Sequence, residues 1–463
     1  MKIAKQKCDV CIVGAGPAGL AALSALKEPY TLDTMNYGQI EQAQRFFKTN
    51  AKALNVCVVD PSDTWMHGWT EKFHELDIQF LRSPVMAHPD HFDQNALLAF
   101  AMTNDRQDEL LESGCANISS LLPLGESQVG LWKLPSTKLF EDFCSDLAKR
   151  LPHDFVQDNV SSIDRPGKHF LVSLKSGSCI EASSVILATG LLGRSVVPSL
   201  VSEAPNERIV QWFEIRHNVR PDWKRILVIG GGLTSVQAAQ HMLRANKTVV
   251  LCSRRPMVER HFDIGLEWFD RRTSTKCMAD FYHRPVQERL DILRGARVGG
   301  SVPPLYMQDV KKWEKEGKLC RMVGEAKYLY SRKEDGTLVV DINSDLHPFD
   351  AIILACGVKA DCTVHPLLKQ ITERWEARIV GGFPLVSEDL ELSDDLFILG
   401  GMASLNLGPD AGNLMGIKRG AAIIANKLEC RRWLRESKVL SSRFDLLWDD
   451  DDTVESSLDN EDD

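Results

Sequence analysis

The chain of 463 residues has 44% hydrophobic and 26% charged residues, which is the composition of a globular protein long enough for two or three domains. Ten acidic residues and no Lys or Arg fall in residues 445–463, so the rest of the chain is near neutral and has no basic excess that would indicate nucleic-acid binding. No run of 18 or more apolar residues suggests a membrane span, and twelve scattered cysteines favour a reducing compartment, with the cytosol as the expected location.

The first structural signal is a glycine-rich turn between an apolar strand and a helix-forming run. Residues 8–13 (CDVCIV) predict the strand, Gly14, Gly16 and Gly19 form the turn, and the helix follows from Leu20. In such turns the glycines allow a tight bend, close approach of a pyrophosphate and close packing of helix on strand. The pattern predicts a dinucleotide site, here assigned to FAD; the alternative is a strand–turn–helix without a ligand.

Asp60 is the candidate ribose ligand of this first site. It ends the next apolar strand, residues 55–60, where an acidic residue ordinarily receives a ribose hydroxyl. Asp60 lies 41 residues after Gly19, which implies an insertion across about residues 28–54. A helical stretch near residues 39–53 in that insertion either lengthens the nucleotide domain or forms a homo-oligomer contact.

A second turn of the same kind follows residues 225–229 (RILVI). Gly230 and Gly232 match the first two glycines, and Ser235 replaces the third. The strand after it, residues 248–252, ends in Ser253, Arg254 and Arg255 instead of an acid. A serine and two arginines suit a 2′-phosphate, so the sequence predicts NADPH rather than NADH. A solvated basic turn is the alternative for the arginines.

Three further apolar strands, residues 185–190, 351–357 and 396–401, end in small residues. The first two follow alternating stretches, residues 170–174 and 338–342, that predict small antiparallel sheets. These elements predict an α/β fold of two Rossmann-like dinucleotide-binding domains, with the NADPH domain inserted in the FAD domain. The expected boundaries are 1–220 for the first FAD part, 221–361 for the NADPH domain, 362–440 for the FAD return and its last helix, and 441–463 for a disordered acidic tail.

With both turns and the inserted domain in place, the chain resembles class B flavin monooxygenases, and in particular the lysine/ornithine N-hydroxylase family. Residues 64–69 (TWMHGW) resemble that family's Ser-Trp-His-Pro-Gly-Met segment beside the flavin, and residues 78–85 (IQFLRSPV) resemble its Met-Gln-x-x-Phe-Leu-Lys-Asp-Leu-Val segment. Residues 408–414 (GPDAGNL) fall where the family returns to the flavin.

The resemblance implies roles for further residues. It assigns Trp65, Gly190, Gly412 and Asn413 to the cofactor, with Trp65 and Trp69 covering the flavin ring; core packing is the alternative for the tryptophans. It places Gln79 and Arg82 on the substrate or flavin side; an ordinary surface-to-core helix or loop is the alternative for both. Arg82 stands for a family lysine, and the asparagines that hold the amino acid in the family are missing near Trp268 and residues 297–301.

The activity implied is oxygenation of a small nucleophile, such as an amine. NADPH would reduce FAD, O2 would form a C4a-hydroperoxyflavin, and one oxygen would pass to the substrate, so no catalytic side chain and no metal are expected. The chain would need no nucleic-acid or membrane partner. Two other functions stay open: a flavin-dependent NADPH oxidase or reductase, and a non-catalytic nucleotide-binding regulatory protein. Disulfide reduction is not favoured, because Cys8 and Cys11 are three apart on a strand and point to opposite faces.

Overall fold

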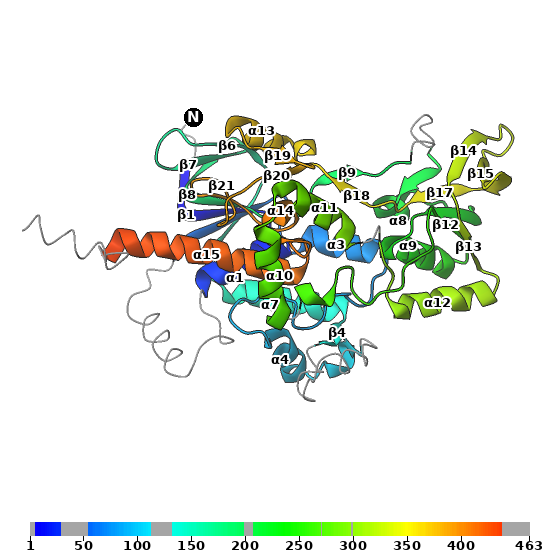
Figure 1. The fold of residues 1–463 in the computed structure, drawn as a ribbon, viewed down its shortest axis with the longest axis horizontal. Coiled ribbons are helices and arrows are strands. Elements are labelled where there is room, and N and C mark those ends of the chain that lie inside the picture. Colours follow the sequence, from blue (N-terminus) through cyan, green and yellow to red (C-terminus); the bar gives the residue numbers. More distant parts are fainter. Residues whose placement is uncertain are drawn as a thin grey trace, which may run out of the picture.

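The computed structural model describes residues 5–28, 54–112, 132–198, 207–269, 271–297 and 300–437. The stretch 39–53 and the acidic tail, both singled out above, lie outside these residues. The described chain forms two lobes joined end to end, with α15 and β1 in one and β11–β17 in the other (Figure 1).

The first lobe is built on a sheet whose central strand precedes the first glycine turn. β1 (Lys5–Val13) pairs in parallel with β2 (Val56–Asp60) on one side and with β8 (Cys179–Leu187) on the other. The sheet continues beyond these neighbours with β5 (Asp154–Gln157), β6 (Val160–Asp164), β7 (Phe170–Leu174), β21 (Glu391–Ser393) and β22 (Leu396–Ile398). Because β22 pairs with β8 in parallel, the chain returns to this sheet after the second lobe.

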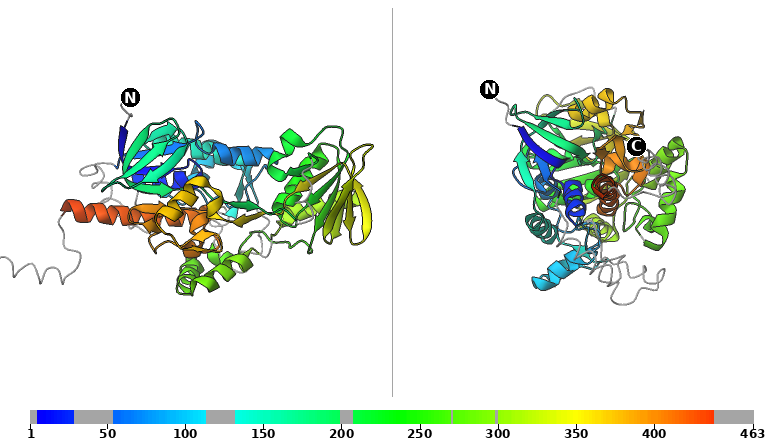
Figure 2. Two further views of the ribbon diagram at one scale, coloured as in Figure 1. Left: turned by 90° about the horizontal axis from the view of Figure 1, so that it is seen from above. Right: turned by 90° about the vertical axis from the view of Figure 1, so that its left-hand side faces the viewer.

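Helix α1 (Pro17–Lys27) is buried along almost its whole length. Pro17 occupies its first turn, where a missing N–H costs nothing, and residues 18–26 are all buried. A helix that is apolar all round is a core helix, and α1 lies against both the sheet and the long helix α15 (Leu414–Ser437), which projects from the lobe (Figure 2). Helix α7 (Thr137–Arg150) covers the same core.

The second lobe contains a fully parallel five-stranded sheet. Its strands, in spatial order, are β10 (Ile209–Gln211), β17 (Ala351–Leu354), β11 (Arg225–Ile229), β12 (Thr248–Ser253) and β13 (Leu319–Val323). One face packs on α9 (Leu233–Arg244) and α12 (Pro304–Lys315). The other face packs on the antiparallel sheet of β14 (Ala326–Ser331), β15 (Leu338–Ile342) and β16 (Asp345–Phe349). Burial on both faces explains why the central strands β11, β12 and β17 read as continuous apolar runs.

A two-stranded ribbon carries the chain between the lobes. β9 (Gly193–Ser195) leads out and β18 (Val358–Ala360) leads back, paired antiparallel. β10 already belongs to the second sheet, so that sheet begins before residue 221, the expected start of the inserted domain.

Shorter elements complete the two lobes. They are α3 (His67–Glu75), α4 (Ala96–Thr103), η2 (Gln107–Glu109), β3 (Leu110–Leu111), β4 (Leu134–Pro135), η4 (Trp212–Glu214), α8 (Ile215–Asn218), η5 (Leu266–Trp268), α10 (Arg271–Tyr282), α11 (Val286–Ala296), η6 (Cys362–Val364), α13 (Pro366–Arg374), β19 (Ile379–Val380), β20 (Phe383–Pro384), η7 (Gly401–Ala403) and α14 (Ser404–Leu407). Within the described ranges, no helix has the length and apolar character needed to cross a bilayer.

Candidate nucleotide sites and the cavity between them

The first glycine turn joins β1 to α1, and its three glycines have different surroundings. Gly14 has φ +112°, and a Cβ there would lie 2.7 Å from the carbonyl oxygen of Ala188. A Cβ on Gly19 would lie 2.0 Å from the Gly14 oxygen, so close packing requires glycine at both positions. At Gly16 a Cβ would meet nothing within 4 Å. This open space at the N-terminus of a buried helix fits a pyrophosphate.

Asp60 lies beside this turn at the end of β2. Its Oδ2 accepts a hydrogen bond from the Ala15 amide at 2.8 Å, and its Oδ1 accepts one from the Ser62 amide at 2.9 Å. The carboxylate is therefore oriented, and it keeps lone pairs for a ribose hydroxyl. Its location fits the predicted role, which stays a prediction.

The two tryptophans pack into the first lobe. The Trp65 indole donates to Nε2 of His153 at 3.1 Å, and its ring meets those of His153 and Phe155 edge-on, next to β5 and so on the Asp60 side of the sheet. The Trp69 ring stacks on Phe73 with 3.8 Å between centroids. Core packing accounts for these contacts, and the predicted cover of a flavin ring stays a prediction.

The second turn repeats the backbone arrangement of the first. A Cβ on Gly230 would lie 2.3 Å from the carbonyl oxygen of Ala355, which follows β17 as Ala188 follows β8. Gly232 is the N-cap of α9, and its Cβ position faces Gly300 at 3.5 Å. Ser235, in place of a third glycine, donates from Oγ to the Gly232 carbonyl at 2.6 Å. Gly231 and Gly232 are half-buried at the start of α9, where a second pyrophosphate is predicted to bind.

The residues that end β12 differ from Asp60 in charge and exposure. Ser253 is buried and donates from Oγ to the Arg255 carbonyl at 2.7 Å, which closes a short turn, whereas the Arg254 and Arg255 side chains are exposed. Burial raises the pKa of the Cys356 thiol, and the positive charge of Arg254 opposes that rise. The Gly230 amide donates to the Cys252 carbonyl at 2.9 Å, so the end of β12, which Arg254 follows, lies beside the second turn, where a 2′-phosphate is expected.

Two predicted cofactor residues, Gly412 and Asn413, follow the second lobe in the chain. Asn413 contacts the segment between β12 and α12 (residues 254–303). The Asn413 amide nitrogen donates to Asp263 at 3.2 Å, and its oxygen accepts from Arg297 at 3.2 Å. Arg297 also forms an ion pair with Asp263 at 2.6 Å. Gly412 lies against Gly401, and Gly190 has φ +76° with open space at its Cβ position. Asn413 thus links the segment between β12 and α12 (residues 254–303) to the first lobe. No local motif in the sequence indicates this contact.

Arg82 links the two lobes. Its guanidinium donates to the His261 carbonyl at 2.8 Å and, from Nη2, to the Arg260 carbonyl at 3.0 Å and Ser301 Oγ at 2.8 Å. Burial, opposed by Asp263 and reinforced by Arg297, lowers its pKa to about 10. The side chain stays charged at neutral pH, but most of its donors are used within the protein.

Gln79 lies on the same segment as Arg82 with an exposed side chain. Its backbone carbonyl accepts a hydrogen bond from the Thr137 amide at 2.8 Å, and Leu81 donates to Pro135 at 3.0 Å. Residues 78–85 thus run beside 133–137. The predicted roles of Gln79 and Arg82 at the substrate stay predictions.

A cavity of about 280 Å³ opens between the lobes at this point. Its walls come from the end of α3, the segment 78–82, strands β3 and β4, and the starts of α9 and α12. The lining residues Thr234, Gln237 and Tyr306 had no signal in the sequence beyond the position of Thr234 just after the second turn.

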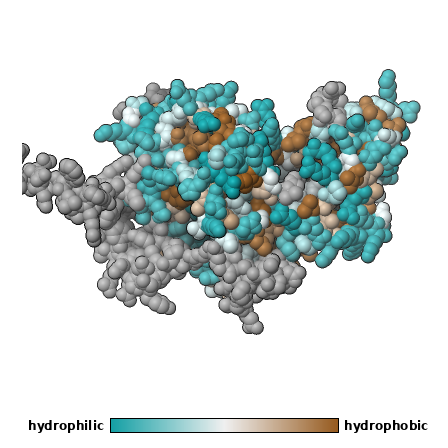
Figure 3. All heavy atoms as spheres, in the orientation of Figure 1, coloured by the Kyte–Doolittle hydropathy of each residue, from teal (hydrophilic) through white to brown (hydrophobic). Residues whose placement is uncertain are grey.

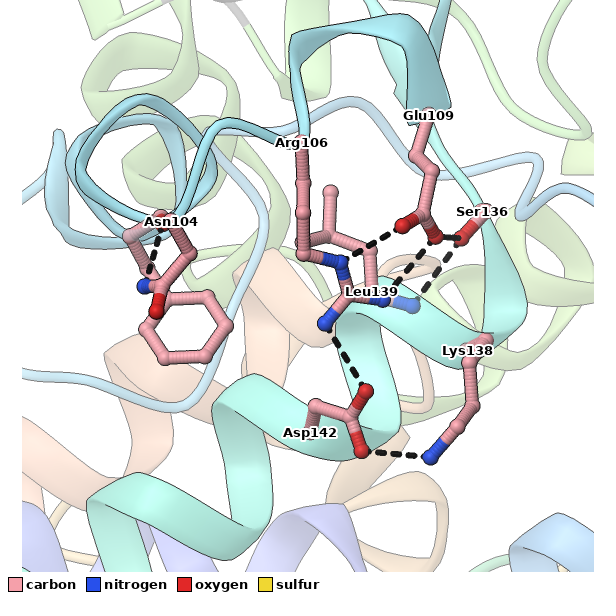
Figure 4. A network of polar contacts seen from close by, with 8 residues as sticks. Asn104, Arg106, Glu109, Ser136, Lys138, Leu139 and Asp142 are labelled. Atoms are coloured by element: carbon pink, nitrogen blue, oxygen red, sulfur yellow. Dashed lines mark hydrogen bonds and ion pairs between the residues drawn. The ribbon is translucent and has the colours of Figure 1, made fainter.

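An ionic network holds the wall formed by β3 and β4 (Figure 4). Arg106 donates to both carboxylate oxygens of Glu109 and to Asp142 on α7. Ser136, the N-cap of α7, accepts from the Leu139 amide at 2.9 Å and donates to Glu109. Hydrogen bonds from Arg106 lower the pKa of the Glu109 carboxyl. The network ties β3 to the helix that follows β4 and so fixes one side of the cavity.

Comparison with known proteins agrees with this architecture. The family model for pyridine nucleotide-disulphide oxidoreductases matches residues 8–269, which include both glycine turns. The chain belongs to this family. The predicted α/β fold with two dinucleotide units, the oxidoreductase class and the pairing of a flavin with a pyridine nucleotide are confirmed at the level of the family.

Solved structures match almost the whole chain at low identity. An ornithine N-hydroxylase of Kutzneria sp. 744 is 16% identical with a TM-score of 0.67, over 92% of this chain and 100% of that one. A cadaverine monooxygenase of Erwinia amylovora is 14% identical with a TM-score of 0.65, over 91% and 94%. A bacillithiol disulfide reductase of Bacillus cereus is 16% identical with a TM-score of 0.52, over 92% and 100%. At these identities the likeness shows the fold alone. The matched folds include those of N-hydroxylases, as the sequence predicted.

One curated relative matches a shorter stretch. A ferredoxin–NADP reductase of Thermus thermophilus is 25% identical over 136 residues, which are 28% of this chain and 40% of that protein. The match therefore spans less than half of that relative.

Proposed function

We propose that the chain is an FAD-dependent, NADPH-using monooxygenase that oxygenates a small nucleophilic substrate in the cavity between the lobes. One observation carries this proposal: the two glycine turns lead to the same cavity. The Met66 amide donates to Ala15 in the first turn at 2.8 Å. Helix α3 follows Met66, spans about 13 Å and leads to Phe73 and Leu76 in the cavity wall. Helix α9 starts at the second turn, and its first residues, Leu233 and Thr234, form the opposite wall.

The described residues fit both cofactors. The open space at Gly16 and the oriented carboxylate of Asp60 suit FAD, while Gly232 and the exposed Arg254 and Arg255 suit NADPH. A bound flavin supplies the exchange of electrons between NADPH and O2. The protein contributes binding, orientation and an apolar chamber that excludes water.

Amine N-hydroxylation is one form of this reaction, and the likeness to ornithine and cadaverine hydroxylases supports it. Electron transfer without oxygenation is the second candidate, supported by the match to a ferredoxin–NADP reductase. A disulfide reductase function is not supported, because Cys8 and Cys11 both lie in β1. Burial also raises the pKa of each thiol, which lowers the fraction of reactive thiolate. A cytosolic location stays a prediction.

The test is a product balance under 18O2. Purified protein with bound FAD is mixed with NADPH and a panel of amines and thioethers, and NADPH consumed, peroxide released and labelled product are measured together. A monooxygenase gives a product that contains one labelled oxygen, with peroxide below the NADPH consumed. Peroxide equal to NADPH, with no labelled product from any compound, would establish an oxidase or reductase.

A further inference from the structure

The cavity also indicates what kind of substrate it takes. We propose that it binds a small, largely apolar compound whose reacting atom is uncharged, such as a thioether, and not a zwitterionic amino acid or an alkylammonium ion. This inference rests on the proposed monooxygenase function and narrows its substrate class.

The first support is the chemistry of the walls. Most lining residues are aliphatic or aromatic, and they come from both lobes; examples are Phe73, Ile78, Phe80, Leu134, Phe262 and Leu305. An amino acid would have to leave its two charged groups unpaired in this space, which is unfavourable because apolar walls do not replace their hydration. An alkyl chain would instead gain from each methylene that it buries.

The second support is that Arg82, Tyr306 and Glu112 in the cavity lining already have partners within the protein. Arg82 donates to two carbonyls and to Ser301, and Tyr306 accepts a hydrogen bond from Gln237 at 3.4 Å. The only carboxylate in the described lining, Glu112, forms an ion pair with Lys133 at 2.8 Å. No described lining residue offers a free carboxylate to a substrate ammonium group.

The third support is the sign of the charge. Lys72 and Arg82 both line the cavity, whereas the charge of Glu112 is balanced by Lys133. The remaining charge is positive. It opposes a second cation and has little effect on a neutral sulfur.

The packing at two other positions agrees with this conclusion. Trp268 lies against Gly408, whose Cβ would come within 2.7 Å of the indole ring, and Arg297 is held by Asp263 and Asn413. These are the regions in which the resembled family carries amino-acid-binding asparagines. Here Trp268 and Arg297 hold the segment between β12 and α12 against the first lobe.

The experiment measures equilibrium binding, separately from turnover. Full-length protein with oxidised FAD is titrated with butyl, hexyl and octyl methyl sulfide, with N,N-dimethylhexylamine and with ornithine, and the fluorescence of tryptophan, including Trp212 in the cavity wall, is recorded. We expect hexyl methyl sulfide to bind about 15-fold more tightly than the butyl compound, from the two added methylenes. The amine should bind at least tenfold more weakly than the hexyl sulfide at pH 7, and ornithine should not bind.

A matched pair of variants locates the binding. Leu305 at the cavity and Leu329 on β14 have the same exposed fraction, 46%, so Leu305→Arg and Leu329→Arg place a charge at equally solvated positions. Apolar patches are scattered over the face in Figure 3, so exposure alone does not mark a site. Leu305→Arg should weaken sulfide binding more than tenfold, and Leu329→Arg should leave it unchanged.

Three outcomes would overturn the inference. They are tighter binding of ornithine or the amine than of the sulfide, equal effects of the two variants on sulfide binding, and a Leu305→Arg variant that loses NADPH affinity but keeps sulfide affinity. The last would assign the cavity to the nicotinamide nucleotide. Sulfide binding without labelled sulfoxide under 18O2 would instead contradict the monooxygenase proposal, so the two failures are distinguishable.

Discussion

In both nucleotide units the first glycine of the turn packs against the carbonyl of an alanine that follows a neighbouring strand. Gly14 meets Ala188 and Gly230 meets Ala355, each too closely for a Cβ. The units then diverge at the third position. Gly19 has no room for a side chain, whereas Ser235 fits and uses its hydroxyl to bond Gly232.

The charged residues differ more than the turns. The first unit has one acid, Asp60, fixed by two backbone amides, and the second has two exposed arginines after a buried serine. We propose that the shared backbone binds a pyrophosphate in each unit and that the residues after the second strand select the nucleotide. Two predictions test this division of labour, and a third concerns the acid stability of the first lobe.

The largest effect is expected in the first turn. Gly14→Val should abolish FAD retention and destabilise the first lobe, because a side chain would clash with Ala188 at a positive φ. Gly16→Val separates these two effects. Its Cβ has space and its φ of −85° suits any residue, so the fold should persist while flavin content falls at least tenfold.

The measurement is the ratio of flavin absorbance to protein, with circular dichroism as the control for folding. Full flavin occupancy in folded Gly16→Val would show that FAD does not bind at the first turn.

The second prediction uses acid to distinguish the lobes. His88, buried in the first lobe, contacts the Gln94 carbonyl through Nε2 at 3.0 Å, and burial together with the charge of Lys418 lowers its pKa to about 3. The unfolded chain binds a proton near pH 6.5 and the folded chain does not, so stability is present above pH 6.5 and is lost as pH falls toward 3. Between pH 6.5 and 4.5 the loss is about 2 kcal/mol, because the unfolded histidine is already half protonated at pH 6.5.

His88→Gln should remove most of that slope, although it lowers stability at pH 7, since an amide can keep the contact with Gln94 but cannot titrate in this range. Urea unfolding of both proteins at pH 4.5 and 7, followed by flavin fluorescence, measures the difference. The same slope in both proteins would mean that other groups cause the acid sensitivity. Asp90 acts in the opposite direction, because burial raises the pKa of its carboxyl.

The parts of the fold that were predictable from sequence are those with local patterns. Strand–turn–helix units carry their own signal, and β7 and β15 occupy the predicted spans 170–174 and 338–342. β10 was not foreseen, because a three-residue strand has too few positions for a period and is defined only by its pairing with β17.

The positions of candidate site residues could be predicted where a local motif determines them. They could not be predicted where segments distant in sequence meet. The position of Asp60 beside the first turn follows from its place at the end of a predicted strand. Arg82 bonds residues 178 to 219 positions away, and Asn413 bonds residues more than 100 positions away, so neither contact has a local signature. The cavity is lined by seven separate stretches of chain from both lobes and has no sequence pattern.

The smallest of the three effects concerns the choice of nucleotide in the second unit. Arg254→Ala should raise the KM for NADPH by about 10- to 100-fold, the worth of one charge-assisted contact to phosphate, and change the KM for NADH less than threefold. Arg321→Ala is the matched control, because Arg321 lies on β13 beside β12 but is paired with Glu314. Steady-state oxidation of NADPH and of NADH at saturating O2 gives the KM for each nucleotide in the wild type and in both variants. Equal changes for both nucleotides in Arg254→Ala would mean that this arginine contacts the shared pyrophosphate or only solvent. In that case the contrast between an acid in one unit and arginines in the other would not explain how the nucleotides are distinguished.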